Sequence, residues 1–239
     1  MTMQVGMVGT DGVLIASDTK WHTVPRVPRD KFWLTGRYTF NRTKIIISHE
    51  RGVAISCAVN METAEHVARE IIRTLPDPNL ADPIPHIKAI GQRVLDVAQT
   101  GRQDATCLIA LMHPIPQLLL FTFGVFEGIR GPVCQRMDDR AFAGDNVNPA
   151  MFWAERYYKK LPVKELVPLA AHLIITAHHL NNGSIGGLEI VFCDQSGFHR
   201  LSDDSILELE AKSREWDTQI EALLLGHKQE FTYAPNVIR

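Results

Sequence analysis

Paired cysteines, long apolar runs and a strong charge of one sign are all missing from this chain of 239 residues. Its four cysteines stand far apart, with no CxxC pair and no Cys/His spacing suited to a tetrahedral zinc site. The ten histidines include no HxH or HExxH pair, so we expect no metal and no cofactor. Reduced, buried thiols are predicted at Cys57, Cys107, Cys134 and Cys193.

Signals for membranes and nucleic acids are also missing. No stretch is apolar over the length that a bilayer requires, and residues 1–12 lack the basic region and apolar core of a signal peptide. The formal net charge is -2, and the basic residues are scattered among acidic ones, which leaves no basic surface for nucleic acid. These observations predict a cytoplasmic protein that binds neither membrane nor nucleic acid.

The chain has the composition of an ordinary globular protein, with 45% hydrophobic and 22% charged residues. Alternating or β-branched apolar runs predict strands, and apolar residues at intervals of three and four predict helices. The predicted strands are 3–18 (a hairpin around Asp11-Gly12), 44–48, 52–59, 106–112, 118–125, short strands in 132–143, 186–194 and 198–202. The predicted helices are 62–75, 86–100, 149–159, 163–180 and 205–224.

The order of these elements indicates the fold class. Runs of strands followed by runs of helices favour antiparallel sheets over βαβ alternation. Two stacked sheets between two helical layers would bury all the amphipathic faces. We therefore predict an α+β protein, a four-layer αββα sandwich of two antiparallel sheets, in a single domain over residues 1–239.

Residues 20–43 interrupt this pattern. They mix aromatic and basic side chains with three helix- or strand-breaking residues and show no sustained period. We predict a long, exposed, inserted loop whose aromatic residues either bind substrate or pack against a neighbouring subunit. These aromatic residues are Trp21, Phe32, Trp33, Tyr38 and Phe40.

The start of the chain carries the most specific motif. After Met1 it reads TMQVGMVGTDGVLIASDT. This closely resembles the N-terminus of proteasome β-subunits, in which a first threonine, Val-Gly, Asp-Gly and Ala-x-Asp-Thr follow one another at the spacing seen here. The resemblance implies the Ntn-hydrolase form of the αββα sandwich and a threonine-type endopeptidase. It extends to bacterial members such as the heat-shock-locus protease and the betaproteobacterial proteasome homologue.

The chemistry explains why a threonine has to come first. A hydroxyl is a poor nucleophile until a base removes its proton, and a terminal threonine carries such a base in its own α-amine. A free α-amine has a pKa of roughly 7.7 to 8.0, so part of it is neutral near neutral pH. Thr2 acquires that amine only when Met1 is removed, and we expect this removal because threonine is small.

The resemblance implies a lysine and an aspartate beside the nucleophile. Asp18, at the end of the first hairpin, takes the place of the aspartate. Lys44 is preferred for the lysine because it opens KIIIS and is soon followed by GVAIS, as in the family. Lys31 is the alternative on spacing, and a solvated strand-end lysine is the non-catalytic interpretation of Lys44.

Two further positions follow from the resemblance. The family's oxyanion hole uses a backbone N–H after the GVAIS-like strand, which places the donor at Cys57 or its neighbour Ala58. Where the family has a serine that assists the amine, this chain has Asp145. We predict either that Asp145 accepts a hydrogen bond from the amine and raises its pKa, or that it caps the following helix.

The segment NNGSIGGLEIVF resembles the family's Asp-x-x-Ser-Gly-Gly. With the two glycines aligned, Asn182 stands at the aspartate, and Ser184 lies one place from the serine. The alternative is a glycine-rich turn between a helix and a strand.

The resemblance also implies partners. We expect a homo-oligomeric double ring, a 14-mer in preference to a 12-mer, that admits unfolded polypeptides or peptides to Thr2. An unfolding ATPase as partner is left open. Two other functions are compatible with the sequence: an inactive ring-forming scaffold, and a small-molecule amidase with the same kind of nucleophile.

Overall fold

The computed structural model describes residues 2–23, 38–75, 82–97, 104–126, 129–145, 147–181 and 184–225. Within these ranges lie twelve strands and five helices. The strands are β1 (Met3–Val8), β2 (Val13–Ser17), β3 (Lys20–Thr23), β4 (Tyr38–Asn41), β5 (Ile45–Ser48), β6 (Val53–Val59), β7 (Ala105–Leu111), β8 (Gln117–Phe126), β9 (Ile129–Met137), β10 (Arg140–Gly144), β11 (Glu189–Asp194) and β12 (Gly197–Arg200). The helices are α1 (Met61–Thr74), α2 (Ile84–Val97), α3 (Met151–Tyr157), α4 (Val163–Leu180) and α5 (Asp203–Leu225).

Two five-stranded antiparallel sheets form the centre of the molecule. The first sheet has the order β10-β1-β2-β11-β12, and the second has the order β5-β6-β7-β8-β9. Strand β1, which follows Thr2, is therefore an inner strand with β10 on one side and β2 on the other. The predicted α+β class with two antiparallel sheets is confirmed.

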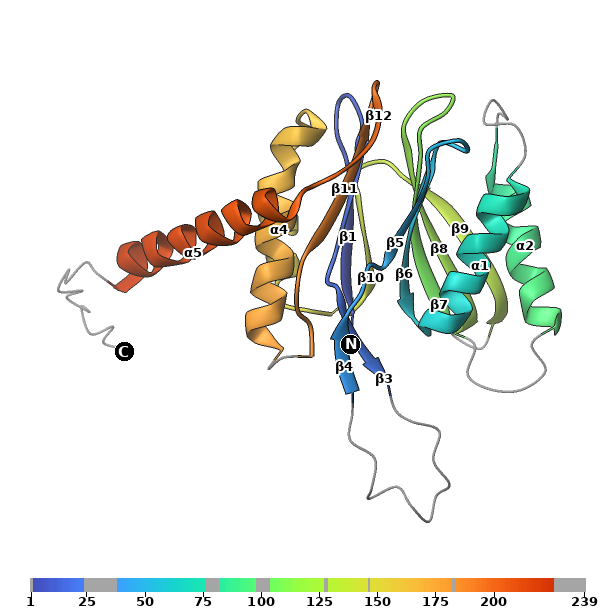
Figure 1. Ribbon diagram of the computed structural model, residues 1–239, viewed down its shortest axis with the longest axis horizontal. Coiled ribbons are helices and arrows are strands. Elements are labelled where there is room, and N and C mark those ends of the chain that lie inside the picture. Colours follow the sequence, from blue (N-terminus) through green and yellow to red (C-terminus); the bar gives the residue numbers. More distant parts are fainter. Residues whose placement is uncertain are drawn as a thin grey trace, which may run out of the picture.

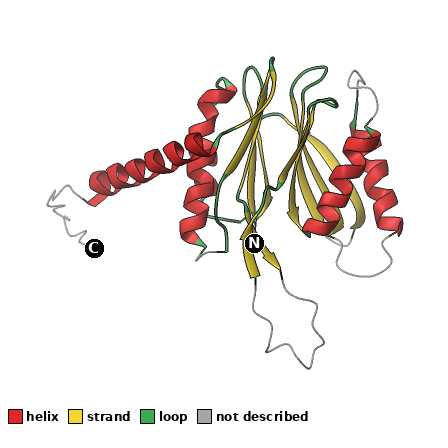
Figure 2. Cartoon of the chain, in the orientation of Figure 1, coloured by secondary structure: helices red, strands yellow, loops and turns green. Residues whose placement is uncertain are grey.

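Helix α4 covers the outer face of the first sheet, and α1 and α2 cover the outer face of the second (Figures 1 and 2). Successive side chains of a strand point to opposite faces, so Leu14 belongs to the core that contains Ile174 of α4, while Ile15 belongs to the core that contains Leu108 of the second sheet. A separate core joins α1, through Ile71, to the outer face of the second sheet. Three apolar cores thus bury the strands on both faces.

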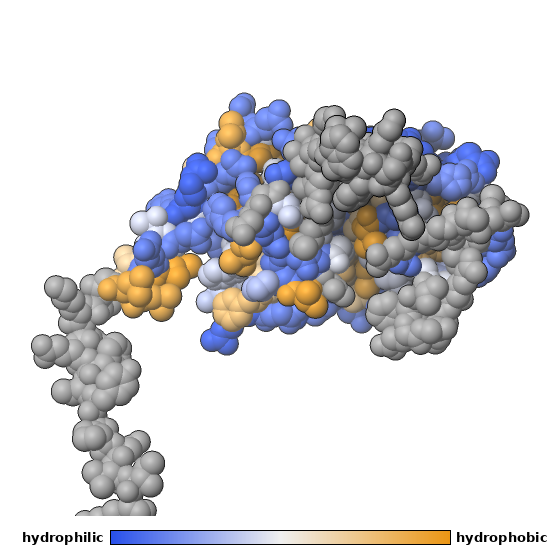
Figure 3. Space-filling view, turned by 90° about the horizontal axis from the view of Figure 1, so that it is seen from below, coloured by the Kyte–Doolittle hydropathy of each residue, from blue (hydrophilic) through white to orange (hydrophobic). Residues whose placement is uncertain are grey.

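Helix α5 differs from the others because only part of it is packed. It contacts α4, and Leu209 and Ser213 are its buried residues. Its second half extends away from the sheets (Figure 1). Apolar side chains gather at its far end (Figure 3), where Leu223, Leu224 and Leu225 are 68%, 74% and 76% exposed.

The predicted inserted loop at 20–43 is partly a hairpin. Strands β3 and β4 pair antiparallel at its base, with Trp21 opposite Phe40. These two rings stack with their centroids 6.0 Å apart, and the Arg42 guanidinium lies 4.8 Å from the centre of the Trp21 ring. Cross-strand aromatic contacts of this kind stabilise a short ladder that has no apolar alternation in its sequence. Residues 24–37, with Phe32 and Trp33, lie outside the described residues.

Candidate active site

Thr2 is held by its main chain at the entrance to β1. The amide of Asp145 donates to the Thr2 carbonyl at 2.7 Å. Gly144, the last residue of β10, has a φ of +86°, and a Cβ added to it would lie 2.1 Å from the Thr2 carbonyl oxygen. Only glycine fits this close approach, so residue 144 fixes the position of the threonine.

The side chains of Thr2, Asp18 and Lys44 meet between the two sheets. Lys44 Nζ donates to Asp18 Oδ2 at 2.9 Å and to Thr2 Oγ1 at 3.0 Å. The other carboxylate oxygen of Asp18 accepts from the amide of Met3 at 3.0 Å. These three side chains, predicted from the sequence as a catalytic group, are thus brought together by the fold.

Burial gives the ion pair unusual properties. The side chains of Lys44 and Asp18 are 1% and 0% exposed. Burial lowers the pKa of the Lys44 ammonium and raises the pKa of the Asp18 carboxyl, and their mutual attraction offsets both shifts in part. A lysine with a lowered pKa, in contact with a hydroxyl oxygen, is suited to hold or move a proton at that oxygen.

Lys44 is the lysine of the pair in the structure. It stands directly before β5, at the position predicted from KIIIS, and its carbonyl accepts from the amide of Cys57 on β6. The alternative, Lys31, lies outside the described residues. The interpretation of Lys44 as a solvated strand-end residue is wrong, because its side chain is fully buried.

The Asp145 carboxylate has a different partner from the two predicted for it. Its Oδ2 accepts from Asn148 Nδ2 at 2.9 Å. Helix α3 begins at Met151, after an N-cap at Ala150 whose amide donates to Asn148 Oδ1 at 3.0 Å. Asp145 therefore does not cap α3, and its hydrogen bond to the Thr2 amine stays a prediction.

The choice of Cys57 as oxyanion donor needs correction. Its amide donates to the Lys44 carbonyl at 3.1 Å and is thus used within the second sheet. Donors alternate along a strand, so the amide of Ala58 points the other way, toward β7, with which it is paired. The next amide on the β5 edge belongs to Val59, beyond the point where β5 begins.

Val59 has an unusual backbone. Its φ is 71°, and among the described residues it is the one non-glycine residue with a positive φ. Its side chain is 51% exposed, although it belongs to a strand that is otherwise buried. A β-branched residue is strained in this conformation, and such strain is concentrated at functional sites. The sequence analysis missed Val59 because nothing in its side chain indicates the conformation.

Val59→Gly is expected to increase the free energy of unfolding by about 1 kcal/mol, because glycine adopts a positive φ without steric cost. Equilibrium urea unfolding measures the change. Val53→Gly on the same strand is the control, and it is expected to be destabilising because Val53 is fully buried. A loss of stability in both variants would contradict the strain at Val59.

The glycine pair before β11 lies against the end of the first hairpin. The Gly186 carbonyl accepts from the Thr19 amide at 3.0 Å, and Gly187, with a φ of +68°, leaves room for the Thr19 hydroxyl. The amide of Ser184 donates to the Asn181 carbonyl at 2.9 Å. Asn182 lies outside the described residues. Catalytic roles for Ser184 and Asn182 stay predictions.

The sequence analysis also missed Glu189. This carboxylate is buried and accepts from the amides of Lys44 and Ile45, at 2.9 and 3.3 Å. The signal that could have found it is a charge inside an otherwise apolar strand, LEIVF, since buried charges are rare unless they are bound.

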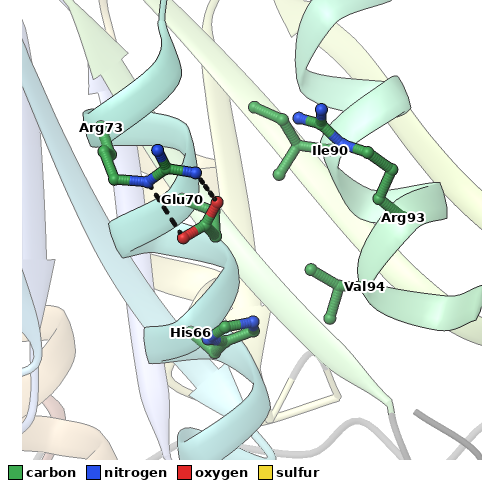
Figure 4. Close-up of a pocket in the computed structure, with 6 residues that line it drawn as sticks. All are labelled: His66, Glu70, Arg73, Ile90, Arg93 and Val94. Carbon is green, nitrogen blue, oxygen red and sulfur yellow. Dashed lines mark hydrogen bonds and ion pairs between the residues drawn. The ribbon is translucent and has the colours of Figure 1, made fainter. Parts of the chain in front are cut away.

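A groove between α1 and α2 lies away from these residues, on the outer helical layer (Figure 4). Glu70 and Arg73 form an ion pair within it at 2.7 Å. Its lining residues are His66, Glu70, Arg73, Ile90, Arg93 and Val94. In the ranges that the structure describes, no group of three or more His, Cys, Asp or Glu residues could hold a metal ion, and none of the helices has the length and hydropathy of a membrane span.

The sequence matches no family model and no curated protein. Its structure does match solved structures. Anbu (ancestral beta-subunit) from Yersinia bercovieri matches with a TM-score of 0.66 and 16% identity, over 95% of this chain and 99% of that one. Anbu from Hyphomicrobium sp. strain MC1 matches with a TM-score of 0.67 and 13% identity, over 97% and 100%.

A third match is the helical assembly of the Anbu complex from Pseudomonas aeruginosa, with a TM-score of 0.68 and 14% identity, over 99% of this chain and 100% of that one. This chain therefore shares the fold of Anbu, an ancestral bacterial homologue of the proteasome β-subunit, over nearly its full length. The predicted resemblance to proteasome β-subunits is confirmed at the level of the fold. At these identities the likeness shows the fold alone.

Proposed function

We propose that this chain is a threonine-type endopeptidase of the N-terminal-nucleophile kind, with Thr2 as its nucleophile once Met1 has been removed. The observation that carries the proposal is the contact of Lys44 Nζ with both Thr2 Oγ1, at 3.0 Å, and Asp18 Oδ2, at 2.9 Å. We take the four-layer sandwich as its Ntn-hydrolase fold and the chain as a single domain, with the segment at about 20–43 inserted in it.

The residues divide the reaction between them. The free amine of Thr2 takes the proton of Oγ1, and Oγ1 attacks the carbonyl carbon of a peptide bond. The C–N bond of the substrate then breaks: the acyl group stays on Oγ1 as an ester, and the Thr2 amine passes the proton to the leaving amine of the substrate. Water then hydrolyses the ester and restores the hydroxyl. The Lys44 ammonium stabilises negative charge on Oγ1 during the attack, and Asp18 keeps this ammonium in place.

We assign the oxyanion donor to the amide of Val59 in place of Cys57. Its support is the alternation of amides along β6, which directs this N–H to the edge where β5 has not yet begun. That edge holds Lys44, whose carbonyl accepts from Cys57 and whose ammonium contacts Thr2. A backbone donor survives any substitution other than proline, so valine is compatible with activity.

Removal of Met1 is the condition for activity. While Met1 is attached, the nitrogen of Thr2 is part of a peptide bond and cannot act as a base. Two measurements test the function together: the intact mass of the purified protein, and covalent labelling of Thr2 by a peptide epoxyketone, which needs both the hydroxyl and the free amine. Processed protein that forms no adduct would refute the peptidase and favour the inactive scaffold.

The protein acts as a homo-oligomer in this proposal. The exposed leucines at the end of α5 support it, because contiguous apolar side chains on a projecting helix mark an interface. The Anbu complex from Pseudomonas aeruginosa forms a helical assembly. A second copy of this chain is the partner we assign to α5, and we propose the 14-mer double ring as the assembly that encloses Thr2 and admits unfolded polypeptide. A small-molecule amidase would need no such enclosure.

Replacing the three leucines Leu223, Leu224 and Leu225 together by serine is expected to reduce the mass of the particle in solution, because it removes the apolar contact between copies. Size-exclusion chromatography with light scattering measures this mass. Leu207→Ser is the control, since Leu207 is 61% exposed on the same helix but lies at its other end. Identical particle masses for the triple variant and the wild type would exclude α5 from the interface.

A further inference from the structure

Glu189 connects the two sheets at the start of β5. It is the first residue of β11 in the first sheet, opposite Ser17 of β2. Its carboxylate reaches the second sheet, where Oε2 accepts from the amides of Lys44 and Ile45, at 2.9 and 3.3 Å. The other oxygen, Oε1, is bound by the Thr43 hydroxyl. Three consecutive residues thus bind one buried carboxylate.

Arg200 of β12 completes this arrangement. Its guanidinium forms an ion pair with Glu189 and donates to the Thr43 hydroxyl at 2.9 Å and to the Ile45 carbonyl at 2.8 Å. The charge of Glu189 is therefore compensated inside the protein, as a buried carboxylate requires. The guanidinium also holds the same short piece of main chain from a second direction.

The main chain of Lys44 is fixed on both sides as a result. Its amide donates to Glu189, and its carbonyl accepts from the Cys57 amide at 3.1 Å. From this fixed point the side chain extends to Asp18 and Thr2. Among the described strands, β5 pairs with β6 alone, so it is the edge strand of its sheet. Without Glu189 the amides of Lys44 and Ile45 would lose the acceptor that binds them from the opposite sheet.

We propose that Glu189 is a positioning residue for Lys44: by binding the amides of Lys44 and Ile45 from the opposite sheet, it sets the contact of the Lys44 ammonium with Thr2 Oγ1. The inference rests on the proposed function for its catalytic consequence. The position of Lys44 Nζ relative to Thr2 Oγ1, which Glu189 is proposed to set, can be tested whether or not the protein is active.

Steady-state kinetics on a short fluorogenic peptide test the catalytic consequence, with processed protein as the starting material. Glu189→Ala is expected to lower kcat by about 100-fold, because a misplacement of about 1 Å in a catalytic group has an effect of this size. KM is expected to stay within about threefold, since Glu189 acts on the chemistry step and not on substrate binding. Because a general loss of folded protein would also lower the apparent kcat at unchanged KM, kcat is calculated from the concentration of folded protein, which circular dichroism measures.

Two other variants serve as comparisons: one keeps the acceptor oxygen at position 189 without the charge, and the other removes a different carboxylate on the same strand. Glu189→Gln keeps a carbonyl oxygen that can accept from both amides, so it is expected to retain kcat within about fivefold of the wild type. Asp194→Asn is the matched control: Asp194 is a carboxylate at the other end of β11, paired with Lys164 at 3.2 Å, and its loss is expected to leave kcat within about twofold.

The outcomes decide the proposal in each case. Folded Glu189→Ala protein with kcat within threefold of the wild type would overturn it. Should this variant not fold, Glu189→Met, which keeps the volume of the side chain, is judged by the same limits. If wild-type protein cleaves no peptide, the proposed function fails, and crystal structures decide the positioning role. A Lys44 Nζ that has moved out of hydrogen-bonding distance of Thr2 Oγ1 in Glu189→Ala supports it, and an unchanged contact overturns it.

Discussion

Thr2→Ala is expected to lower kcat/KM for peptide hydrolysis by about 10,000-fold or more, the loss seen when a covalent nucleophile is removed. The reason is that Thr2 Oγ1 is the atom that forms the ester in the proposed reaction, and Lys44 Nζ lies 3.0 Å from it. Hydrolysis of a fluorogenic peptide by protein of verified intact mass measures the effect.

Thr2→Ser is the control for this experiment. Serine keeps the hydroxyl and the α-amine and is small enough for Met1 to be removed, so this variant is expected to retain activity within about tenfold and to accept an epoxyketone. Particle mass should be the same in all three proteins. Equal activity of Thr2→Ala and the wild type would show that Thr2 is not the nucleophile and that another group catalyses the hydrolysis.

Asp18→Asn is expected to cost about 3 kcal/mol of stability, because it leaves the Lys44 ammonium buried without a counter-charge. The asparagine can still accept from the Met3 amide, as Asp18 Oδ1 does at 3.0 Å, so the loss reports mainly on the ion pair. Urea-induced unfolding followed by circular dichroism measures it. The same variant is expected to be inactive, since its lysine is displaced or neutral.

The double variant Asp18→Asn with Lys44→Met separates charge from packing. Methionine fills the space of the lysine stem without a charge, so the double variant is expected to recover about 2 kcal/mol of the loss while staying inactive. Lys44→Met alone completes the cycle. The assigned cost of an unpaired Lys44 ammonium is contradicted by either of two results. One is an Asp18→Asn variant whose free energy of unfolding falls by less than about 1 kcal/mol, and the other is a double variant no more stable than Asp18→Asn.

Local patterns were sufficient for the first hairpin. Asp11-Gly12 between two apolar runs predicted a turn, and β1 and β2 pair around it with Val8 opposite Val13. The fold uses Asp11 for a second purpose that no local pattern contains: its carboxylate accepts from the amide of Val163, the first residue of α4, at 2.7 Å. That helix lies about 150 residues later in the chain and becomes a neighbour only after folding.

The inserted segment at 20–43 shows the opposite case. The sequence lacks the alternation of a strand there, and a loop was the natural prediction. The ladder of β3 and β4 depends on the stacking of Trp21 on Phe40 and on the Arg42 side chain, which covers Trp21. These residues are about twenty positions apart, so their contact cannot be read from a period along the chain.

The residue types of the candidate site were determined by the sequence alone: a hydroxyl nucleophile at Thr2, a carboxylate at Asp18 and an ammonium at Lys44, each at a position whose neighbours resemble one family. Tertiary structure decided what surrounds them. In the fold, the Lys44 ammonium donates to Thr2 Oγ1, and the Cys57 amide donates to the Lys44 carbonyl within the second sheet. Glu189, from the opposite sheet, accepts from the Lys44 amide. The physical reason is that residue chemistry and local turns depend on adjacent positions, whereas hydrogen bonds between the two packed sheets join positions up to 155 residues apart, as from Arg200 to Ile45.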